Sequence, residues 1–462
     1  MIAIDLSPTL RLHERLAGLA QERPDDVARG LSGANAAIRS RGVTFGGEKE
    51  MPIALSALVL SAKDVARLEA AARMLWSILE KVLDATMDDP GCFDRWAADH
   101  RRMRPWLRKT PGSKSWQLFS RYDAAVAPDG RVQFIECNTG CPAGFLHAAD
   151  FSVETRSVLE SMGALPDRPI KALGMIRPTS LVDLLTSVEE RSGLPTGLFG
   201  LLTDENNLKL ELDLLERGLR DRGRRAAVVD SRTLDYFQGR LRCGGEAISV
   251  AFQKVRVSTP ESPHHCWKPG FEHRYGSLLA AIGDEAVAPV NNLCALSVAE
   301  DKTMLARLFH PETRGLLSPE ERAFVDENIP WTARLAPGSA DYRGEAVDLL
   351  EFVRKRKDAF VVKPANEGRG YEVHVGPQTP QEEWDRLCRP NPRLPMVVQE
   401  FVPPVALPVA RLAEGGVRSE PMHLTIALGM VDGRYEGVLS RISPNIVTNV
   451  GRQGFVQAVF VA

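Results

Sequence analysis

Two short alternating segments around a tight turn constrain this chain more than any other feature of its sequence. The segments SWQLFSRYDAAVA and RVQFIECN flank the turn residues Pro128, Asp129 and Gly130. Apolar and polar residues alternate in both segments, as they do in half-buried strands. The pattern therefore predicts an antiparallel β-hairpin from about Trp116 to Asn138.

The polar residues of this hairpin form the sharpest functional pattern in the chain. Arg121 and Asp123 lie two apart on the first strand. Glu136 and Asn138 lie two apart on the second, so each pair shares one face. Three oxygen-bearing side chains suit Mg²⁺, and Arg121 could neutralise charge on a transferred phosphoryl group. The alternative is a charged, solvent-facing side of a hairpin.

A second candidate segment is FVVKPANEGRGYEVHVG. Lys363 stands at the end of its first apolar strand, and Gly368 and Gly370 follow in a loop before the next strand. Glycines allow backbone amides to approach phosphate closely, and the lysine supplies a positive charge. Taken alone, the segment is equally consistent with an ordinary surface hairpin.

Two further strand ends could complete such a site. In PMVVQEFV, the residues Gln399, Glu400 and Val402 lead from an apolar strand into a proline-containing linker, whose backbone could bond an adenine edge. In YEGVLSRISPNIVTNVGRQG, Arg441 ends a strand and Asn449 stands in a polar, glycine-bearing loop that could hold phosphate. Each segment by itself could equally be an ordinary strand end or loop.

Composition limits the possible partners. The 58 Lys and Arg residues balance 60 Asp and Glu residues, so no electrostatic reason exists to expect a nucleic acid or an acidic membrane as partner. The seven Cys residues have no regular disulfide spacing, and no apolar run reaches the roughly 20 residues of a membrane span. We therefore expect a cytoplasmic protein with small-molecule or peptide-sized substrates.

With these residues in view, the chain resembles the ATP-grasp ligases, and most closely the circularly permuted members grouped with glutathionylspermidine synthetases. In unpermuted relatives the lysines, the adenine hinge, the arginine strand and the Asn-Gly loop precede the Asp and Glu-x-Asn block, which here comes first. The resemblance covers about 115–145 and 295–462, and 197–257 loosely. It implies an α/β (α+β) fold class: a circularly permuted ATP-grasp fold with a preceding α/β substrate domain and a helical N-terminal region.

The resemblance also implies roles for individual residues. Lys302, in AEDKTML, and Lys363 would contact the phosphates of ATP, and Glu400 and Val402 would frame its adenine and ribose. The implied magnesium ligands are Asp123, Glu136 and Asn138. Arg121 would lie near the transferred phosphate, and Arg441 and Asn449 resemble the strand and loop that precede the magnesium block in unpermuted relatives. The candidate catalytic residues are thus Arg121 and Arg441, and the other candidate cofactor-binding positions are Gly368, Gly370, Gln399 and Asn449. A chemical role for Cys137 or Cys141, which lie beside the proposed metal ligands, stays open.

The expected domain organisation follows from these patterns. Apolar residues recur at three- and four-residue steps from Lys63 to Leu83, which predicts a helix, and a second helix is expected from Glu345. The expected parts are a mainly helical N-terminal region (1–110), a permuted segment with the magnesium-binding hairpin (111–190), an α/β domain preceding the grasp (191–292) and the nucleotide-binding region (293–462).

The function expected from the resemblance is ATP-dependent joining of a carboxylate to an amine through an acyl-phosphate, with ATP and Mg²⁺ as cofactors. The alternatives are a catalytically silent ATP- or peptide-binding module and a small-molecule kinase. Amino acids, peptides and polyamines all remain open as substrates, and so does the oligomeric state.

Overall fold

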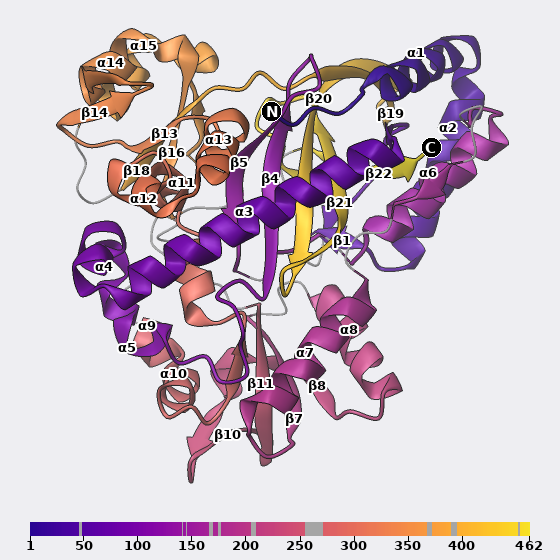
Figure 1. The fold of residues 1–462 in the computed structure, drawn as a ribbon. Helices are drawn as coiled ribbons and strands as arrows, with labels where there is room; N and C mark the ends of the chain where they lie inside the picture. Colours follow the sequence, from indigo (N-terminus) through magenta and orange to yellow (C-terminus); the bar gives the residue numbers. More distant parts are fainter. Residues whose placement is uncertain are drawn as a thin grey trace.

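A computed structural model gives the fold of the chain (Figure 1). It describes residues 1–45, 49–140, 142–144, 146–165, 170–173, 177–204, 209–254, 271–366, 372–389, 395–450 and 453–462. Helices cover several β-sheets, so the predicted mixture of α and β structure is confirmed. The division of the chain at residues 110, 190 and 292 stays a prediction.

The largest sheet lies at the centre of the molecule and joins early and late segments of the chain (Figure 1). In order of pairing, its strands are β3 (Ala57–Leu60), β22 (Phe455–Val461), β21 (Arg434–Ser443), β20 (Gly416–Val431), β4 (Phe119–Val126) and β5 (Val132–Asn138), with β19 (Ala406–Ala413) along β20 and β6 (Lys171–Ala172) along β22. The β4–β5 hairpin is therefore the continuation of a sheet whose long strands come from the end of the sequence.

The predicted hairpin is confirmed, with its first strand beginning at Phe119. Its turn residue Gly130 has a φ of +83°, and a Cβ at this position would lie 2.2 Å from the carbonyl oxygen of Ile4. Both the backbone conformation and this close approach therefore require glycine. The N–H of Arg131 donates to the Asp129 carboxylate at 3.1 Å and closes the turn.

A β-bulge interrupts the pairing within the hairpin. Asp123 lies opposite Glu136, but the next residue, Ala124, lies opposite Phe134. Ile135 is left without a partner residue on β4, as in other bulges where two residues oppose one. Its carbonyl group is therefore available to a group outside the hairpin.

Four helices pack against the central sheet: α1 (Ser7–Glu22), α2 (Pro24–Ser40), α3 (Ala62–Asp88) and α6 (Ala148–Ser161). Two short helices, α4 (Pro90–Trp96) and α5 (Arg104–Leu107), follow α3 and lie beyond its end, against other helices. A small two-stranded sheet, β1 (Thr44–Phe45) and β2 (Lys49–Glu50), follows α2. The helix predicted over 63–83 is confirmed as part of α3, which crosses one face of the sheet (Figure 1). A capping box of Ser61 and Asp64 fixes its start.

The α/β unit predicted between Gly197 and Val257 forms a separate sheet, at the bottom of Figure 1. Its strands pair in the order β8 (Ala226–Asp230), β7 (Leu198–Thr203), β11 (Glu246–Lys254), β10 (Arg240–Cys243) and β9 (Asp235–Phe237), and β12 (Ala288–Val290) also pairs with β11. The associated helices are α7 (Pro178–Ser192), α8 (Lys209–Asp221), α9 (Phe271–Arg274) and α10 (Gly276–Gly283). The predicted alternation of strand, helix and strand is confirmed for the described residues.

A third unit carries the segment of Lys363. Its sheet has the order β13 (Thr332–Arg334), β18 (Met396–Glu400), β16 (Phe360–Pro364) and β17 (His374–Val375). Around it lie α11 (Thr303–Arg307), α12 (Pro311–Leu316), α13 (Pro319–Asn328), α14 (Leu349–Lys355) and α15 (Gln381–Leu387), together with the hairpin of β14 (Ser339–Tyr342) and β15 (Glu345–Asp348).

The prediction of a helix from Glu345 is wrong in its starting point. Residues Glu345–Asp348 form β15, because the turn at Arg343 and Gly344, both with positive φ, folds them back along β14. The helix α14 begins only after Asp348, whose carboxylate accepts from the N–H of Glu351 and so acts as its N-cap.

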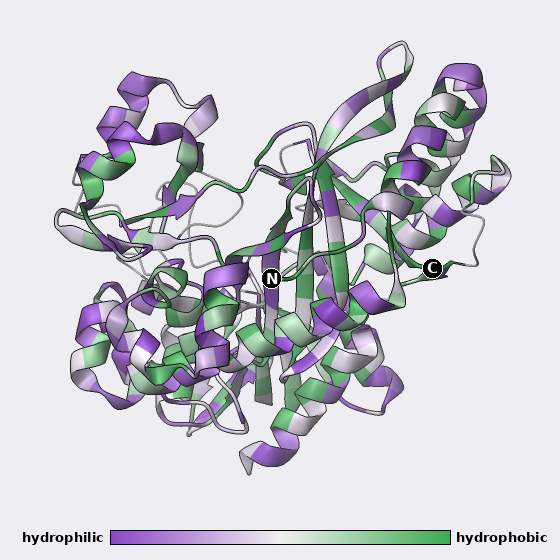
Figure 2. Cartoon of the chain, turned by 45° about the horizontal axis from the view of Figure 1, so that its top comes forward, coloured by the Kyte–Doolittle hydropathy of each residue, from purple (hydrophilic) through white to green (hydrophobic). Residues whose placement is uncertain are grey.

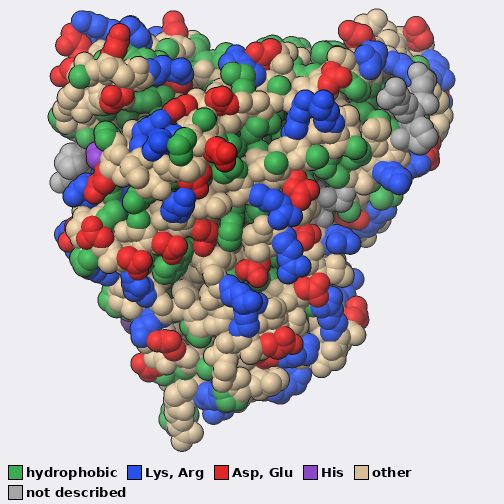
Figure 3. Space-filling view, in the orientation of Figure 1, with side chains coloured by type: hydrophobic (Ala, Val, Ile, Leu, Met, Phe, Trp, Pro, Cys, Tyr) green, Lys and Arg blue, Asp and Glu red, His purple; other side chains and the backbone are tan. Residues whose placement is uncertain are grey.

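Apolar residues are concentrated in the strands and on the inner faces of the helices, whereas the outer faces of the helices are mostly hydrophilic (Figure 2). Lysine and arginine side chains are interspersed with acidic ones over the face in Figure 3. None of the helices in the described ranges combines the length and the apolar character required to cross a bilayer.

Candidate functional site

The predicted metal-binding residues lie together on the β4–β5 hairpin. Arg121 lies directly opposite Asn138, and Asp123 directly opposite Glu136. Because directly opposite residues of an antiparallel pair point to the same face, these four side chains share one face of the sheet. The structure thus brings together the residues that their period-two spacing had predicted to be neighbours.

Two guanidinium groups hold the carboxylate of Asp123. Arg121 donates to both of its oxygens, at 2.7 and 3.0 Å, and Arg441 donates to Oδ2 at 2.7 Å. Burial raises the pKa of Asp123, but the charges of the two arginines lower it by more, so the pKa lies below its ordinary value of 3.8. Asp123 is therefore an anion at neutral pH, and its Oδ1 accepts only one of the three hydrogen bonds.

Arg441 reaches this carboxylate across β20. Its position on β21 is opposite Thr425, and Asp123 on β4 is opposite Ala427 of the same strand. The Thr425 hydroxyl donates to the Thr448 hydroxyl at 2.9 Å, which ties the loop of Asn449 to the strand position that faces Arg441. The side chain of Arg441 therefore reaches the hairpin, and the loop of Asn449 is linked to β20, the strand that pairs with β4.

Glu136 forms an ion pair with the first predicted lysine. The ammonium of Lys302 lies 3.1 Å from Oε1 of Glu136, with 6% of the lysine side chain and 25% of the glutamate side chain exposed. Burial lowers the pKa of Lys302, but Glu136, Glu300 and Asp301 raise it by more, and the net pKa is above its ordinary value. Lys302 is therefore firmly protonated.

Lys363 approaches the hairpin from the four-stranded sheet. Its ammonium donates to the carbonyl of Ile135, the bulged residue, at 2.8 Å, and to Oε1 of Gln399 at 2.9 Å. Burial lowers the pKa of Lys363 from 10.5 to about 8, and the attraction of Glu136 offsets only part of that effect. Both hydrogen-bond acceptors are uncharged, so this lysine holds its proton much less firmly than Lys302.

The segment predicted to contact adenine ends β18. Gln399 is buried and links Lys363 to the Thr332 hydroxyl. The carboxylate of Glu400 accepts from the Trp331 N–H at 3.1 Å, from the Tyr342 hydroxyl at 2.7 Å and from the guanidinium of Arg343.

Glu400 therefore links β18 to the β14–β15 hairpin. Val402 lies just beyond the strand and is partly buried. Gly368 and Gly370, the other residues predicted beside Lys363, lie outside the described residues, as does Cys141.

Sequence reasoning missed Glu300. One of its carboxylate oxygens accepts from the backbone N–H of Thr139 at 3.0 Å and also from the N–H of Gly140. Its only sequence signal is its place two residues before Lys302, in AEDKTML. An acidic residue at such a position is typical of the exposed face of a helix.

Cys137 shows no feature of a reactive thiol. It lies on β5 between Glu136 and Asn138 but is buried, and burial together with the nearby carboxylates raises the pKa of its thiol far above the ordinary value. A thiol protonated at neutral pH is a poor nucleophile, so Cys137 packs the hairpin rather than serving chemistry.

The donor set of the hairpin fits Mg²⁺. Carboxylate and amide oxygens are the hard ligands that this ion prefers, and Oδ1 of Asp123 and the partly exposed Glu136 retain acceptor capacity. In the part of the chain that the structure describes, no three His, Cys, Asp or Glu side chains are grouped as a metal site, so the fit depends on the amide of Asn138 as well.

Two buried polar atoms at this face have no hydrogen-bond partner among the described residues: Nδ2 of Asn138 and Nε of Arg441. An unsatisfied buried donor costs free energy. Both atoms lie at the same face of the sheet and remain able to donate to a polar ligand.

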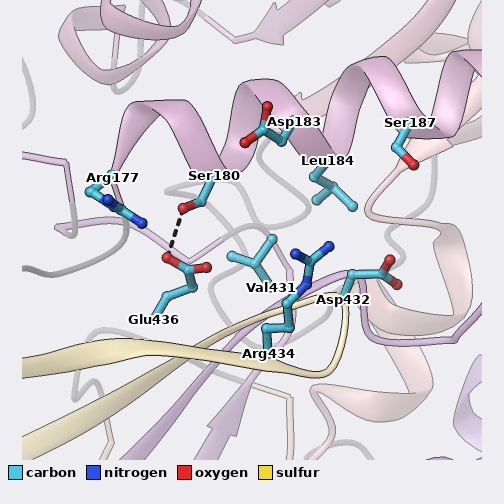
Figure 4. A pocket seen from close by; sticks show the side chains of 9 residues that line it. All are labelled: Arg177, Ser180, Asp183, Leu184, Ser187, Val431, Asp432, Arg434 and Glu436. Carbon is cyan, nitrogen blue, oxygen red and sulfur yellow. Dashed lines mark hydrogen bonds between the residues drawn. The ribbon is translucent and has the colours of Figure 1, made fainter.

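The cavity in Figure 4 lies elsewhere, between α7 and the β20–β21 turn. It has a volume of about 130 Å³ and is lined by Arg177, Ser180, Asp183, Leu184, Ser187, Val431, Asp432, Arg434 and Glu436. None of these is a predicted site residue. The Ser180 hydroxyl donates to Glu436 at 2.7 Å, as Figure 4 shows, and Asp183 pairs with Arg222.

No protein-family model and no curated protein sequence matches this chain. Among solved structures, the chain is similar to a glutathione synthetase-like effector, GSS30, from Globodera pallida in its apo form. The sequence identity is 11% and the TM-score 0.60, over 95% of this chain and 98% of that one. At this identity the likeness defines the fold alone, and the chain therefore has a glutathione synthetase-like fold.

Proposed function

We propose that this protein is an ATP-dependent carboxylate–amine ligase of the ATP-grasp class, with its phosphate- and metal-binding segments in circularly permuted order. One observation carries the proposal: Lys302 and Lys363, from separate late segments, both reach the early β4–β5 hairpin, Lys302 at the Glu136 carboxylate and Lys363 at the adjacent Ile135 carbonyl. Lysines and carboxylates brought together in this way suit a nucleotide phosphate and its metal ion.

The sheet order supports the permuted arrangement. The hairpin with Asp123 and Glu136 precedes both lysines in sequence, yet it pairs along β20, beside the strand that carries Arg441. The glutathione synthetase-like fold supports the ligase class, although the similar structure is described as an effector. The catalytic activity of this chain therefore requires a direct test.

In the proposed site, Lys302 and Lys363 bind the phosphates of ATP, and Asn449, Gly368 and Gly370 are the further candidate phosphate-binding residues. Gln399, Glu400 and Val402 border the adenine and ribose. Asp123, Glu136 and Asn138 would hold Mg²⁺, which when bound neutralises charge on the phosphates. Arg121 and Arg441 would balance the charge of the transferred phosphoryl group.

The proposed reaction has two steps. A substrate carboxylate oxygen attacks the γ-phosphorus of ATP, an O–P bond forms, the bond to the β,γ-bridging oxygen breaks, and ADP leaves. The amine nitrogen then attacks the acyl carbon, the C–N bond forms, and phosphate leaves with the C–O bond electrons as the amine loses a proton. The protein contributes orientation and electrostatic stabilisation, and no covalent enzyme intermediate forms.

ADP release tests the proposal. The protein would be incubated with magnesium-ATP and pooled amino acids, small peptides and polyamines, and the wild type compared with Glu136→Ala and Lys363→Ala. Asp183→Ala, on the distant α7, is the control. We expect ADP only when an acid and an amine are both present, and its loss in both site variants but not in the control.

The second candidate is a silent ATP- or peptide-binding module with the same fold. The carboxylate of Asp123 already accepts three hydrogen bonds from Arg121 and Arg441, which compete with a metal ion and so favour this second candidate. ATP binding without ADP release in any pool would support this candidate. A stable phosphorylated product formed without an amine would instead indicate a small-molecule kinase.

A further inference from the structure

The carboxylate of Glu300 connects the two halves of the proposed site. It accepts hydrogen bonds from the N–H groups of Thr139 and Gly140, which directly follow the proposed metal ligand Asn138. Glu300 itself stands two residues before Lys302, the proposed phosphate contact. One side chain therefore fixes the end of the metal-binding strand to the start of the lysine segment.

The contact with Glu300 requires that residue 140 has no side chain. A Cβ on Gly140 would lie 2.4 Å from Oε2 of Glu300 and 3.1 Å from its Cδ. The φ of Gly140 lies outside the left-handed region, so the backbone would accept alanine, and the approach of Glu300 is what excludes it. The glycine and the glutamate are therefore complementary.

The same turn is held from two further sides. The Thr139 hydroxyl donates to the Ala295 carbonyl at 2.7 Å, and the amide of Asn291 donates to the Thr139 carbonyl. The turn after Asn138 is thus fixed through its backbone, while the Nδ2 of Asn138 is left without a partner among the described residues.

Charged groups surround Glu300 on the side of the proposed site. Lys302 stabilises its anion and Glu136 opposes it, and the burial of Glu300 raises its pKa above the ordinary value. The charge of Glu300 also acts on Arg121. Glu300 is therefore coupled electrostatically to a phosphate contact, to a metal ligand and to the arginine that holds Asp123.

We propose that Glu300 is a positioning residue that holds Asn138 and Glu136 in the geometry that binds Mg²⁺, through its hydrogen bonds to Thr139 and Gly140. The inference rests on the proposed function. Glu300 touches backbone amides rather than the reacting atoms. Its loss should therefore raise the Mg²⁺ concentration that ATP binding requires. Metal-free ATP binding should not weaken, because the change removes a negative charge near Lys302.

The test measures how much Mg²⁺ is needed for half-maximal binding of a non-hydrolysable ATP analogue. Groups that orient metal ligands typically change metal affinity about 10- to 100-fold when removed, so we expect an increase of about tenfold or more in Glu300→Ala. Glu300→Gln should show a smaller increase, because its amide oxygen still accepts both N–H bonds. An unchanged Mg²⁺ requirement in a folded Glu300→Ala protein would overturn the proposal.

Glu80 offers a matched control. Its carboxylate also accepts from two successive backbone N–H groups, those of Trp116 and Gln117, at 2.8 and 2.9 Å, and burial raises its pKa as well. Glu80→Ala should lower the free energy of unfolding without changing the Mg²⁺ requirement. An equal change in both variants would mean that Glu300 is only structural.

Two further measurements test this proposal, and the second does not depend on nucleotide binding. Gly140→Ala should raise the Mg²⁺ requirement in the wild-type background but not further in Glu300→Ala, where the clash is absent. Hydrogen exchange of the free protein should become faster at Thr139 and Gly140 in Glu300→Ala. If the wild type binds no nucleotide, the proposed function fails, and unchanged exchange at these amides would independently reject the role of Glu300.

Discussion

The ammonium of Lys302 lies 3.1 Å from the carboxylate of Glu136 and pairs a proposed phosphate contact with a proposed metal ligand. In the absence of ligands, each group neutralises the other. ATP bound without metal would meet a lysine whose charge is already offset, and a metal ion would meet a carboxylate that already has a cation beside it. The pair therefore favours joint binding of the nucleotide and its metal ion.

Glu136→Gln should separate the binding of ATP from the binding of its metal ion. The variant removes a negative charge beside Lys302, so we expect severalfold tighter binding of ATP in the presence of a chelator, because Coulomb repulsion of the phosphates falls. Dependence of binding on Mg²⁺ should weaken, because one of the three proposed metal ligands loses its charge. Isothermal titration calorimetry with and without Mg²⁺ measures both effects, and weaker metal-free binding than in the wild type would contradict the expectation.

ATP affinity should fall as pH rises through about 8. The pKa of Lys363 is lowered to about 8 by burial, so its ammonium loses its proton in this range, whereas the raised pKa of Lys302 keeps that residue charged. Titration of ATP affinity from about pH 7 to 9.5 tests this. In Lys363→Arg the decline should be absent, and a decline of equal size in that variant would assign it to another group.

The contribution of Asp123 to the free energy of unfolding should be present at neutral pH and disappear in acid. Its folded pKa lies below 3.8, so its ionised form stabilises the protein above that pH, and this contribution is lost as pH falls through the folded pKa. Urea unfolding of the wild type and Asp123→Asn between about pH 6 and 2.5 compares the two. We expect the difference in stability to shrink towards low pH. A constant difference would mean that Arg121 and Arg441 do not lower the pKa of Asp123.

Glu400→Ala should destabilise the four-stranded sheet. The change leaves the Trp331 N–H and the Tyr342 hydroxyl without their acceptor, and an unsatisfied group costs about 1–3 kcal/mol. Arg343→Ala is the control, since an exposed ion pair contributes about 0–1 kcal/mol. Equal losses in denaturant unfolding would mean that the Arg343 contact dominates. A loss of ATP affinity in Glu400→Ala alone would add support for its place beside the ribose.

The hairpin could be predicted because its information is local. Gly130 and its neighbours specify the turn, and the two-residue spacing of Arg121 and Asp123 puts both on one face. The start of α14 was predicted wrongly, because EAVDLLEFV has apolar residues at spacings that also suit a helix. Only the pairing of β15 with β14, and the capping contact of Asp348, decide between strand and helix.

The contacts across the site depend on tertiary structure. Nothing near Arg441 in the sequence indicates that it reaches Asp123, because that contact requires β20 to lie between their strands. The strand end of YEGVLSRI indicated Arg441 and the resemblance to ATP-grasp ligases supplied Lys302, but neither named the partner of the residue. Glu300 could not be recognised at all, since it binds backbone N–H groups, which every residue except proline has, and such contacts leave no pattern in the sequence.

The insertion of β4 and β5 beside β20 has a consequence for synthesis of the protein. The hairpin leaves the ribosome early, but the strand that covers its edge is made only when residues 416–431 have been translated. Until then the hairpin has an unpaired edge, and pairs so distant in sequence form slowly. Nascent chains should therefore be prone to aggregate and depend on chaperones more than a chain with the same sheet built from consecutive strands.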